Sequence, residues 1–565
     1  MMDMDNESPQ RMTMSMTRSV KTTMLHMPQR SIFRALIYLA SLFLLLFCVQ
    51  AVFVPNQVYP VNIEDPSAMF REYKQLPEDS VDVLFLGTSH VQYGINPMEI
   101  YREQQIVSYN LSTSGQKLAT SYYMLEEAVK TQHPKAVLLD ASSIYLTTYW
   151  ETELRVPLDG FFTGKTKLKA AQHYAVLKAE NDPTSGQAAW FTRSRAFLSA
   201  YDSLYRFHDR WDELRRQDFE DYKMTNYWMK GYVFFGGTLP GSCTVEEMNA
   251  AAQWMSEQTT LVTTETDADG VTVTDEEPAT LYSATPGEAE LDWLWKLREL
   301  CDENGAELIV FKTPVIIKPR NYDSAWTKLK SDTIREILAE KNIRFVDCLY
   351  DAELGYDTAT DFIDGGKHCN FLGALKTSDY MADYLADTVQ ISPQEHPQYE
   401  SCLARYEAVR SAGVLETTTD ANTYLTLLED ETEDRLVLIA EKNEESDGQS
   451  GLTIIDEGTA VYTAVSDRKL TKEYSPCEGV SITLESAGSR DSAEGDILAR
   501  ITINGAQYSL DQTGRNIVVY DKKARAVLDS VAISDNSGSN GSAMILSRAD
   551  AKNYLLPYIY ALPGK

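Results

Sequence analysis

Residues 81–90 of the chain read VDVLFLGTSH, and this stretch decides the fold class. A short, mostly apolar run is followed at once by glycine, threonine and serine, and a helical pattern begins after them. An apolar run of this length between turn signals is typical of a strand that is buried on both faces. Ser89 would then lie at the carboxyl end of that strand and at the start of a helix. In parallel sheets, ligands bind at this edge.

Strands and helices alternate along the following chain. The further strands that we expect lie at residues 136–139, 307–311 and 344–346. The helices that we expect lie at residues 121–132, 291–304 and 324–341. Strands that alternate with helices form a parallel sheet covered by helices on both faces. The sequence therefore predicts an α/β domain, which we assign to residues 81–392.

A long insertion interrupts this domain at about residues 149–286. Its first part, up to residue 254, is rich in aromatic and charged residues, which predicts a helical cap over the sheet. Further along, the spacing from Glu265 to Glu276 matches a calcium loop. The Val/Thr alternation around it and the turn signal Asp269-Gly270 favour an exposed hairpin or a loose acidic loop instead.

The last part of the chain changes to a β pattern. Residues 393–450 contain two prolines at the start and a polar run at the end, which predicts a connector. From residue 451 to residue 565, short alternating runs are separated by turn signals such as Asn504-Gly505. This spacing is typical of a compact β-sandwich or barrel.

Residues 35–55 (ALIYLASLFLLLFCVQAVFVP) carry no charged side chain. About 20 apolar residues at 1.5 Å each span the ~30 Å hydrocarbon core of a membrane. Basic residues precede the run and none follows it before Arg71, so the positive-inside rule puts residues 1–34 in the cytoplasm. We expect a single-pass signal anchor, then a stalk at residues 56–80 and domains outside the cell. A cleaved signal peptide is the alternative.

Composition excludes several classes of protein. The chain of 565 residues has 52 Lys and Arg against 83 Asp and Glu, a net charge of −31. That charge argues against nucleic acid as the main partner, because phosphate binding needs a basic surface. The seven cysteines contain no CxxC pair and match neither a disulfide scaffold nor a zinc site, although one or two bridges stay open. No nucleotide or metal motif is present, so no cofactor is implied.

Two distant motifs carry residues suited to acyl chemistry. A serine hydroxyl such as that of Ser89 is a weak nucleophile and needs a base. Residues 364–374 (DGGKHCNFLGA) supply His368 as that base and Asp364 to orient it. The main-chain N–H of Ser89 can stabilise an oxyanion. Gly115, in the polar loop at residues 109–116, can bring a second N–H close to the same substrate oxygen.

Four further residues are candidates for the pocket: His90, Asn110, His208 and Asn370. His90 adjoins the serine, and neighbouring side chains on such a turn diverge, which favours a structural or substrate-lining role over that of the base. His208 lies in the insertion, where packing is the alternative to a pocket role.

Together these residues resemble the SGNH (GDSL-type) hydrolase superfamily. The stretches GTSHVQYGINP, NLSTSGQ, RFHDRWDEL and HCNFLGA resemble its membrane-anchored members in Gram-positive bacteria, similar to the D-alanyl transfer protein of teichoic-acid synthesis and to alginate-acetylation proteins. The resemblance covers residues 80–390. It implies a three-layer α/β/α fold, a Ser-His-Asp triad and acyl chemistry on surface glycans.

The chain departs from the pattern of that superfamily at two points. Its final block usually reads Asp-x-x-His, whereas Asp364 stands four positions before His368, so a bulge at Gly365-Gly366 is needed and Asp361 is the alternative acid. The third-block Asn, a side-chain donor to the oxyanion, is absent, and Asp140 stands at that strand end. Losing one such donor can lower the rate by a factor of ~10² to 10³.

The C-terminal region resembles the interleukin-like EMT inducer domain over residues 452–545. The stretches ARITINGAQYSL and GRNIVVYDKKARAVLDSVAI carry the resemblance. It implies a sugar-binding or docking module, and a purely structural β domain is the alternative.

The sequence thus predicts a serine O-acyltransferase or esterase on the outer side of the cell membrane. Its substrate would be extracellular polysaccharide or teichoic acid, and a transferase would need a membrane acyltransferase partner to supply the acyl group. The alternative function is that of a catalytically silent scaffold that binds surface glycan for partner enzymes.

Overall fold

The computed structural model describes most of the chain. The described residues are 29–53, 67–147, 151–181, 189–214, 228–239, 241, 243–256, 260–266, 272–278, 284–317, 327–351, 354–430, 432–442, 449–487, 498–536 and 543–560.

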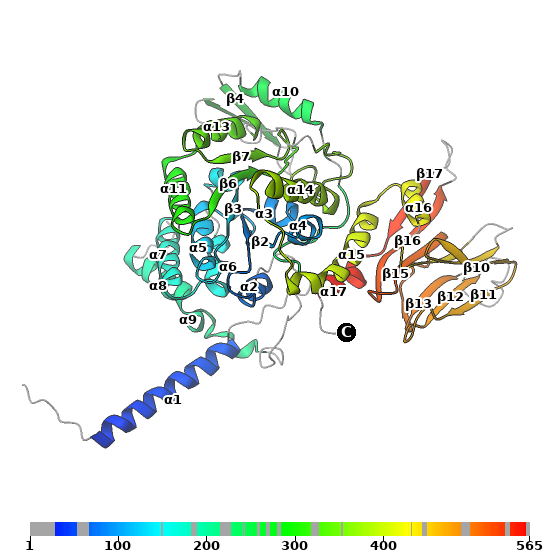
Figure 1. The fold of residues 1–565 in the computed structure, drawn as a ribbon, viewed down its shortest axis with the longest axis horizontal. Coiled ribbons are helices and arrows are strands. Elements are labelled where there is room, and N and C mark those ends of the chain that lie inside the picture. The colour runs from blue at the N-terminus through cyan, green and yellow to red at the C-terminus, as the bar shows by residue number, and fades with distance from the viewer. Residues whose placement is uncertain are drawn as a thin grey trace, which may run out of the picture.

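A parallel five-stranded sheet forms the centre of the first domain (Figure 1). Its strands, in spatial order, are β2 (Ser108–Asn110), β1 (Val83–Leu86), β3 (Ala136–Asp140), β6 (Glu307–Lys312) and β7 (Arg344–Asp347). The predicted parallel sheet is confirmed, and the four predicted strands are present within a residue or two. The strand β2 was not expected, because its sequence SYN is short and polar.

Helices cover both faces of this sheet. One face is covered by α5 (Leu118–Ala128), α11 (Glu288–Glu303) and α13 (Thr327–Glu340), and the other by α3 (Ser89–Gly94), α4 (Pro97–Gln104) and α14 (Phe371–Asp383). Alternate residues of each strand enter the two cores, as Leu84 and Phe85 do on β1. Because β1 and β3 are buried on both faces, their sequences are apolar at almost every position.

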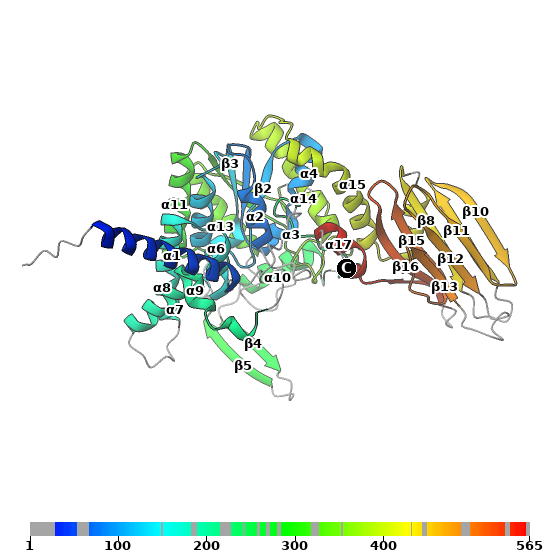
Figure 2. The same cartoon turned by 90° about the horizontal axis from the view of Figure 1, so that it is seen from below.

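The helical insertion lies beside the sheet and not over it. It comprises α6 (Glu151–Gly160), α7 (Gly164–Glu180), α8 (Ala189–Tyr201) and α9 (Ser203–Phe207). Tyr123 of α5 contacts Phe162 and His173 of the insertion, with ring centroids at 6.1 and 5.9 Å. The prediction of helices is confirmed, but these four helices do not form the predicted cap. An aromatic outer face on α5 lets the insertion extend the helical layer outward (Figures 1 and 2).

The segment expected to be a stalk belongs in part to the α/β domain. Helix α2 (Ser67–Lys74) buries Met69, Phe70 and Tyr73 in the same core as α5 and α11. The rings of Phe70 and Phe161 stack with centroids 4.9 Å apart. These three apolar residues share one helical face, a signal that outweighs the polar residues around them.

The acidic part of the insertion contains a β-hairpin. Strand β4 (Thr260–Thr266) pairs antiparallel with β5 (Thr272–Pro278), after helix α10 (Val245–Ser256). The hairpin prediction is confirmed. Residues 267–271, in the middle of the calcium-like spacing, lie outside the described residues.

The predicted connector is largely helical, which corrects that interpretation. Helix α15 (Pro397–Thr417) and helix α16 (Ala421–Glu429) occupy most of it. Pro397 is the first residue of α15, where a missing N–H costs nothing and the fixed φ suits a helix. A proline taken for a break therefore begins a helix.

The C-terminal domain is a sandwich of two antiparallel sheets (Figure 2). The six-stranded sheet contains β10 (Thr459–Ser466), β9 (Ser450–Asp456), β8 (Arg435–Lys442), β15 (Gly514–Asp521), β16 (Ala526–Asn536) and β17 (Ala543–Arg548). The four-stranded sheet contains β11 (Leu470–Tyr474), β12 (Ile482–Ala487), β13 (Leu498–Ile503) and β14 (Ala506–Gln507). The β-rich prediction is confirmed, but the domain begins at β8 and not at residue 451. Asn504 and Gly505 form the predicted turn, with φ of 49° and 82°.

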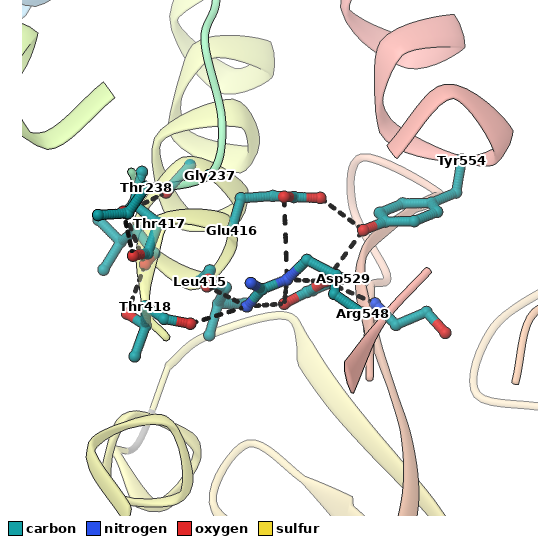
Figure 3. A network of polar contacts seen from close by, with 12 residues as sticks. Gly237, Thr238, Leu415, Glu416, Thr417, Thr418, Asp529, Arg548 and Tyr554 are labelled. Carbon is teal, nitrogen blue, oxygen red and sulfur yellow. Dashed lines mark hydrogen bonds and ion pairs between the residues drawn. The ribbon is translucent and has the colours of Figure 1, made fainter. Parts of the chain in front are cut away.

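A buried polar network joins this sandwich to α15 (Figure 3). Arg548 of β17 donates to the carbonyl oxygens of Leu415 at 2.6 Å and Thr418 at 3.1 Å. The same guanidinium pairs with Asp529 at 3.1 Å and lies 3.8 Å from Glu416. These bonds link the first and second domains through the end of one helix.

The N-terminal helix α1 (Gln29–Phe53) projects from the α/β domain (Figure 1). A search confined to the described residues finds no helix with both the length and the apolar character of a membrane span.

All seven cysteines are free thiols.

Candidate active site

The turn from β1 into α3 holds Ser89 at the carboxyl edge of the sheet. Thr88 is the N-cap of α3, and its hydroxyl donates to Oδ2 of Asp140 at 2.7 Å. Gly87 leaves no room for a side chain, because a Cβ there would lie 2.4 Å from Cβ of Asp140 and 2.7 Å from Cγ2 of Val91. These contacts fix the path of the chain immediately before the serine.

The structure brings Ser89, His368 and Asp364 together. Oγ of Ser89 lies 2.8 Å from Nε2 of His368, although 279 positions separate them in the sequence. Nδ1 of His368 lies 2.7 Å from Oδ2 of Asp364. An ionised carboxylate only accepts hydrogen bonds, so Nδ1 carries the proton and Nε2 accepts from the serine hydroxyl. In this tautomer an imidazole can take the proton of a serine.

The carboxylate of Asp364 is suited to orient the ring. Burial acts to raise its pKa, but the hydrogen bonds and charge of His368 outweigh that effect and hold the pKa below its usual range. The main-chain N–H of His368 also donates to Oδ1 of Asp364 at 2.7 Å. Asp364 is therefore ionised at neutral pH and can stabilise the imidazolium that forms when His368 takes a proton.

A short loop carries the acid and the histidine. An antiparallel bridge between Phe362 and Cys369 closes it. Between these residues, Gly365 and Gly366 have φ of 76° and 99°, a left-handed conformation that favours glycine. A Cβ on Gly366 would lie 1.8 Å from the carbonyl oxygen of Ile316. The two glycines thus accommodate the extra residue that the spacing required.

The alternative acid, Asp361, lies elsewhere. Its buried carboxylate forms an ion pair with Lys376 at 2.6 Å and accepts from the main-chain N–H of Asp357 at 2.7 Å. The structure brings Asp364, and not Asp361, to His368.

Aromatic rings enclose His368. The ring of His90 lies with its centroid 4.7 Å away, and Tyr93 makes an edge contact at 5.2 Å. Tyr93 in turn contacts Phe235 from the insertion at 4.4 Å. Burial lowers the pKa of His90 well below its usual value, and the charges of Lys312 and His368 act in the same direction. His90 is therefore neutral and lines the site. The sequence offered no signal for Tyr93 or Phe235.

Two main-chain N–H groups are candidates for an oxyanion hole. Among the described residues, the N–H groups of Ser89 and Gly115 have no hydrogen-bond acceptor. The N–H of Ser89 has no acceptor because Ser89 begins α3, and the N–H groups of the first turn of a helix have no partner in a preceding turn. Thr113, in the loop of Gly115, donates its N–H to the carbonyl of Gly87 at 3.2 Å. This bond holds the loop beside the serine, and the role of Gly115 as second donor stays a prediction.

Asp140 is the last residue of β3, the strand that pairs with β1. It accepts from the hydroxyl of Thr88 at 2.7 Å and from the N–H of Ser142 at 3.0 Å. Its carboxylate therefore supports the turn before Ser89 and offers no donor to an oxyanion. We did not expect this role from the sequence. The available signal was an acid that ends a strand next to that of the serine.

Asn110 and Asn370 are fully buried and stabilise the loops of the site. The amide of Asn110 donates to two main-chain carbonyls of α3 and its C-cap, at 2.9 and 3.0 Å. Asn370 caps α14 by accepting from Gly373 N–H at 3.2 Å, and its amide donates to the carbonyl of Thr360 at 2.6 Å. We expected both residues to line the pocket, but their side chains bond to the main chain of neighbouring elements instead.

The structure does not bring His208 to the serine. His208 is exposed, and its Nδ1 lies 2.7 Å from the carbonyl oxygen of Tyr205. It follows α9, which packs on α8 and α1 and lies away from α3 and α14 (Figures 1 and 2).

A cluster of acids lies on α4 and α14. One oxygen each of Glu99, Glu103 and Asp379 lie within 4.8 Å of one another. Glu99 pairs with Arg102 at 3.0 Å and Arg410 at 3.1 Å, so arginines balance its charge. Burial and the charge of Glu99 raise the pKa of Asp379 to about 7. The arginine partners of Glu99 and the raised pKa of Asp379 explain how these acids can lie close together without a metal ion.

Comparison with known proteins gives little further information. No protein-family model and no curated protein matches the chain. Among solved structures, the chain is similar to a Bacteroides fragilis protein with a provisional acylhydrolase assignment, at 9% identity and a TM-score of 0.25. The match covers 59% of this chain and 98% of the other. A likeness this slight carries no argument about the function.

Proposed function

We propose that the protein is a serine esterase or O-acyltransferase of the SGNH type. The observation that carries this proposal is the connected series Ser89–His368–Asp364, with hydrogen-bond distances of 2.8 and 2.7 Å. A serine, a histidine and an acid at these distances, on a turn that begins a helix, have the geometry of a nucleophile with its base and orienting group.

The reaction would proceed in two halves. In the first, His368 Nε2 takes the hydroxyl proton while Ser89 Oγ attacks the ester carbonyl, and the protonated ring then gives that proton to the departing alcohol. In the second, water or a sugar hydroxyl attacks the acyl-serine and gives its proton to His368, which passes that proton to Ser89 Oγ as the acyl group leaves it. Water completes a hydrolysis, and a sugar hydroxyl completes an acyl transfer.

The substrate and the cellular setting are part of the proposal. The apolar run at residues 35–55 would anchor the protein in the cell membrane with both folded domains outside. Surface polysaccharide or teichoic acid would be the acyl acceptor, and a membrane acyltransferase would supply the acyl group. The C-terminal sandwich would bind or dock to glycan, as its resemblance to the interleukin-like EMT inducer domain implies.

Ester hydrolysis tests the proposed chemistry. Purified full-length protein in detergent is incubated with 4-nitrophenyl acetate, and release of 4-nitrophenol is compared for wild type, Ser89→Ala and His368→Ala. Ser114→Ala is the matched control, because this serine is exposed in the neighbouring loop. We expect turnover in wild type and control, and loss to the background rate in the other two. Equal rates in wild type and Ser89→Ala would contradict the proposal and favour the silent scaffold.

A further inference from the structure

A cavity of ≈ 230 Å³ lies next to the triad, where β3 and β6 end. Its polar lining is His90, Ser142, Tyr145, Lys312, Lys330 and Ser331. The last two belong to the first half of α13. Pockets for drug-sized ligands measure ~300–1,000 Å³, so this cavity suits a small chemical group and not a length of glycan.

Lys312 brings an unbalanced charge to this cavity. It is the last residue of β6, and only 9% of it is exposed. Its Nζ donates to the carbonyl of Thr313 at 3.2 Å, while an ammonium has three donors. Among the described residues, no carboxylate forms an ion pair with it. A buried charge without a partner is costly, so sites of this kind are expected to receive an anion.

The nearest acid does not fill that role. Asp347 is the register partner of Lys312 on the neighbouring strand β7. Its Oδ1 already accepts from the N–H groups of Leu349 at 3.0 Å and Tyr350 at 3.2 Å. Burial raises the pKa of Asp347, against the effect of Lys312. One oxygen of this carboxylate is thus held by its own loop, and no ion pair joins Asp347 to Lys312 in the described part of the chain.

Two further residues favour an anion in the cavity. Lys330 adds a second positive charge and lies over the ring of Tyr145, 5.2 Å from its centroid. His90 is neutral, and its Nδ1 is buried without a hydrogen-bond partner in the described part of the chain. Since His90 also contacts His368, the cavity lies one side chain away from the triad. Two lysines thus line this cavity in a chain with a net charge of −31.

We propose that this cavity binds a carboxylate or phosphate group that the substrate carries close to the ester bond. Lys312 would be the main contact and Lys330 a second one. The inference rests on the proposed function and adds the substrate class, an ester with a negative charge on its acyl or its alcohol side.

Two pairs of esters distinguish a negative charge on the acyl side of the substrate from one on its alcohol side. For the acyl side, mono-4-nitrophenyl succinate is compared with 4-nitrophenyl butyrate, which has the same chain length and no charge. For the alcohol side, release of acetate from O-acetylglycerol 3-phosphate is compared with release from O-acetylglycerol. We expect wild type to prefer the charged ester of one pair by roughly tenfold or more in kcat/KM, as a hydrogen-bonded charge gives. Lys312→Met should remove that preference.

A matched pair of variants on α13 serves as the control. Lys330→Gln should reduce the preference, whereas Lys328→Gln should retain it, because Lys328 pairs with Asp332 and does not line the cavity. This pair keeps the test decisive if Lys312→Met does not fold. Turnover of the neutral esters without preference for a charged one in either pair would overturn the inference.

Direct binding separates a failure of this inference from a failure of the proposed function. Succinate and inorganic phosphate are titrated into the Ser89→Ala variant, which is expected to bind these anions without turning over an ester. The same titrations are made with the double variant Ser89→Ala, Lys330→Gln. Binding that weakens at least tenfold in the double variant supports the anion site even if no ester is hydrolysed. Absence of binding of both ions to Ser89→Ala, with no charge preference in kcat/KM, would contradict it.

Discussion

At the scale of single residues, the reactivity of Ser89 depends on which ring nitrogen of His368 carries the proton. The hydrogen bond from Nδ1 to Asp364 at 2.7 Å keeps Nε2 unprotonated and directed at the serine, 2.8 Å away. The sequence predicted these three residues, because each belongs to a short local pattern. It could not predict Tyr93, Phe235 or Lys312, whose positions depend on how distant elements pack.

Replacing Asp364 by Asn should therefore remove activity without removing the fold. An amide at this position favours the opposite tautomer, in which Nε2 carries the proton, and such a change lowers kcat by ~10²- to 10⁴-fold. The measurement is steady-state ester hydrolysis with circular dichroism of the same sample. Asp361→Asn is not a suitable control, because that buried carboxylate forms an ion pair with Lys376. Activity of Asp364→Asn within threefold of wild type would contradict the proposed role.

At the scale of secondary-structure elements, the close approach of β1 to β3 decides how α3 begins. Replacing Gly87 by Ala would place a Cβ 2.4 Å from that of Asp140 and move the serine. Overpacking of this kind lowers the free energy of unfolding by about 1–3 kcal/mol, and we expect a larger loss in ester turnover than this destabilisation explains. Thermal unfolding and kcat/KM are measured side by side.

Gly94 gives the matched control on the same helix. A Cβ there would lie 3.5 Å from Cγ2 of Thr313, an ordinary contact. Gly94→Ala should leave turnover unchanged and stabilise the helix by up to about 1 kcal/mol. A similar loss of activity in both variants would show that the space at Gly87 is not the cause.

The same scale shows why some elements were predicted and others were not. The strands β1, β3 and β6 are apolar on both faces, so composition alone identified them. The strand β2 has only three residues, which pair with β1 through main-chain bonds that composition does not encode. Helix α15 was taken for a connector because prolines precede its polar sequence, and its burial against the sandwich depends on tertiary contacts.

At the scale of the whole molecule, the buried network between the domains makes stability depend on pH. Burial, together with the charge of Asp529, raises the pKa of Glu416 to about 7, while Arg548 opposes this effect. Between about pH 4.5 and 7 the unfolded chain releases this proton and the folded chain retains it. The folded state then binds more protons, so the free energy of unfolding falls as pH rises through this range.

Glu416→Gln should remove this part of the pH dependence. Gln can still accept from the hydroxyl of Tyr554, which lies 2.6 Å from Oε1 of Glu416. We expect the difference in Tm between Glu416→Gln and wild type to become more positive from pH 5 to pH 8. Since Asp379 titrates in the same range, only the difference between the two proteins is informative. A difference that is constant across this range would contradict the assigned charge state.

Labelling with a fluorophosphonate, which reacts with activated serines, tests whether Ser89 is an activated nucleophile. Full-length protein in detergent is treated with the probe, and intact mass and peptide mapping report the site and stoichiometry. We expect one adduct per chain, on Ser89, that is lost in Ser89→Ala and strongly reduced in His368→Ala and Asp364→Asn. No adduct on folded wild-type protein, or equal labelling in wild type and His368→Ala, would contradict an activated serine at this site.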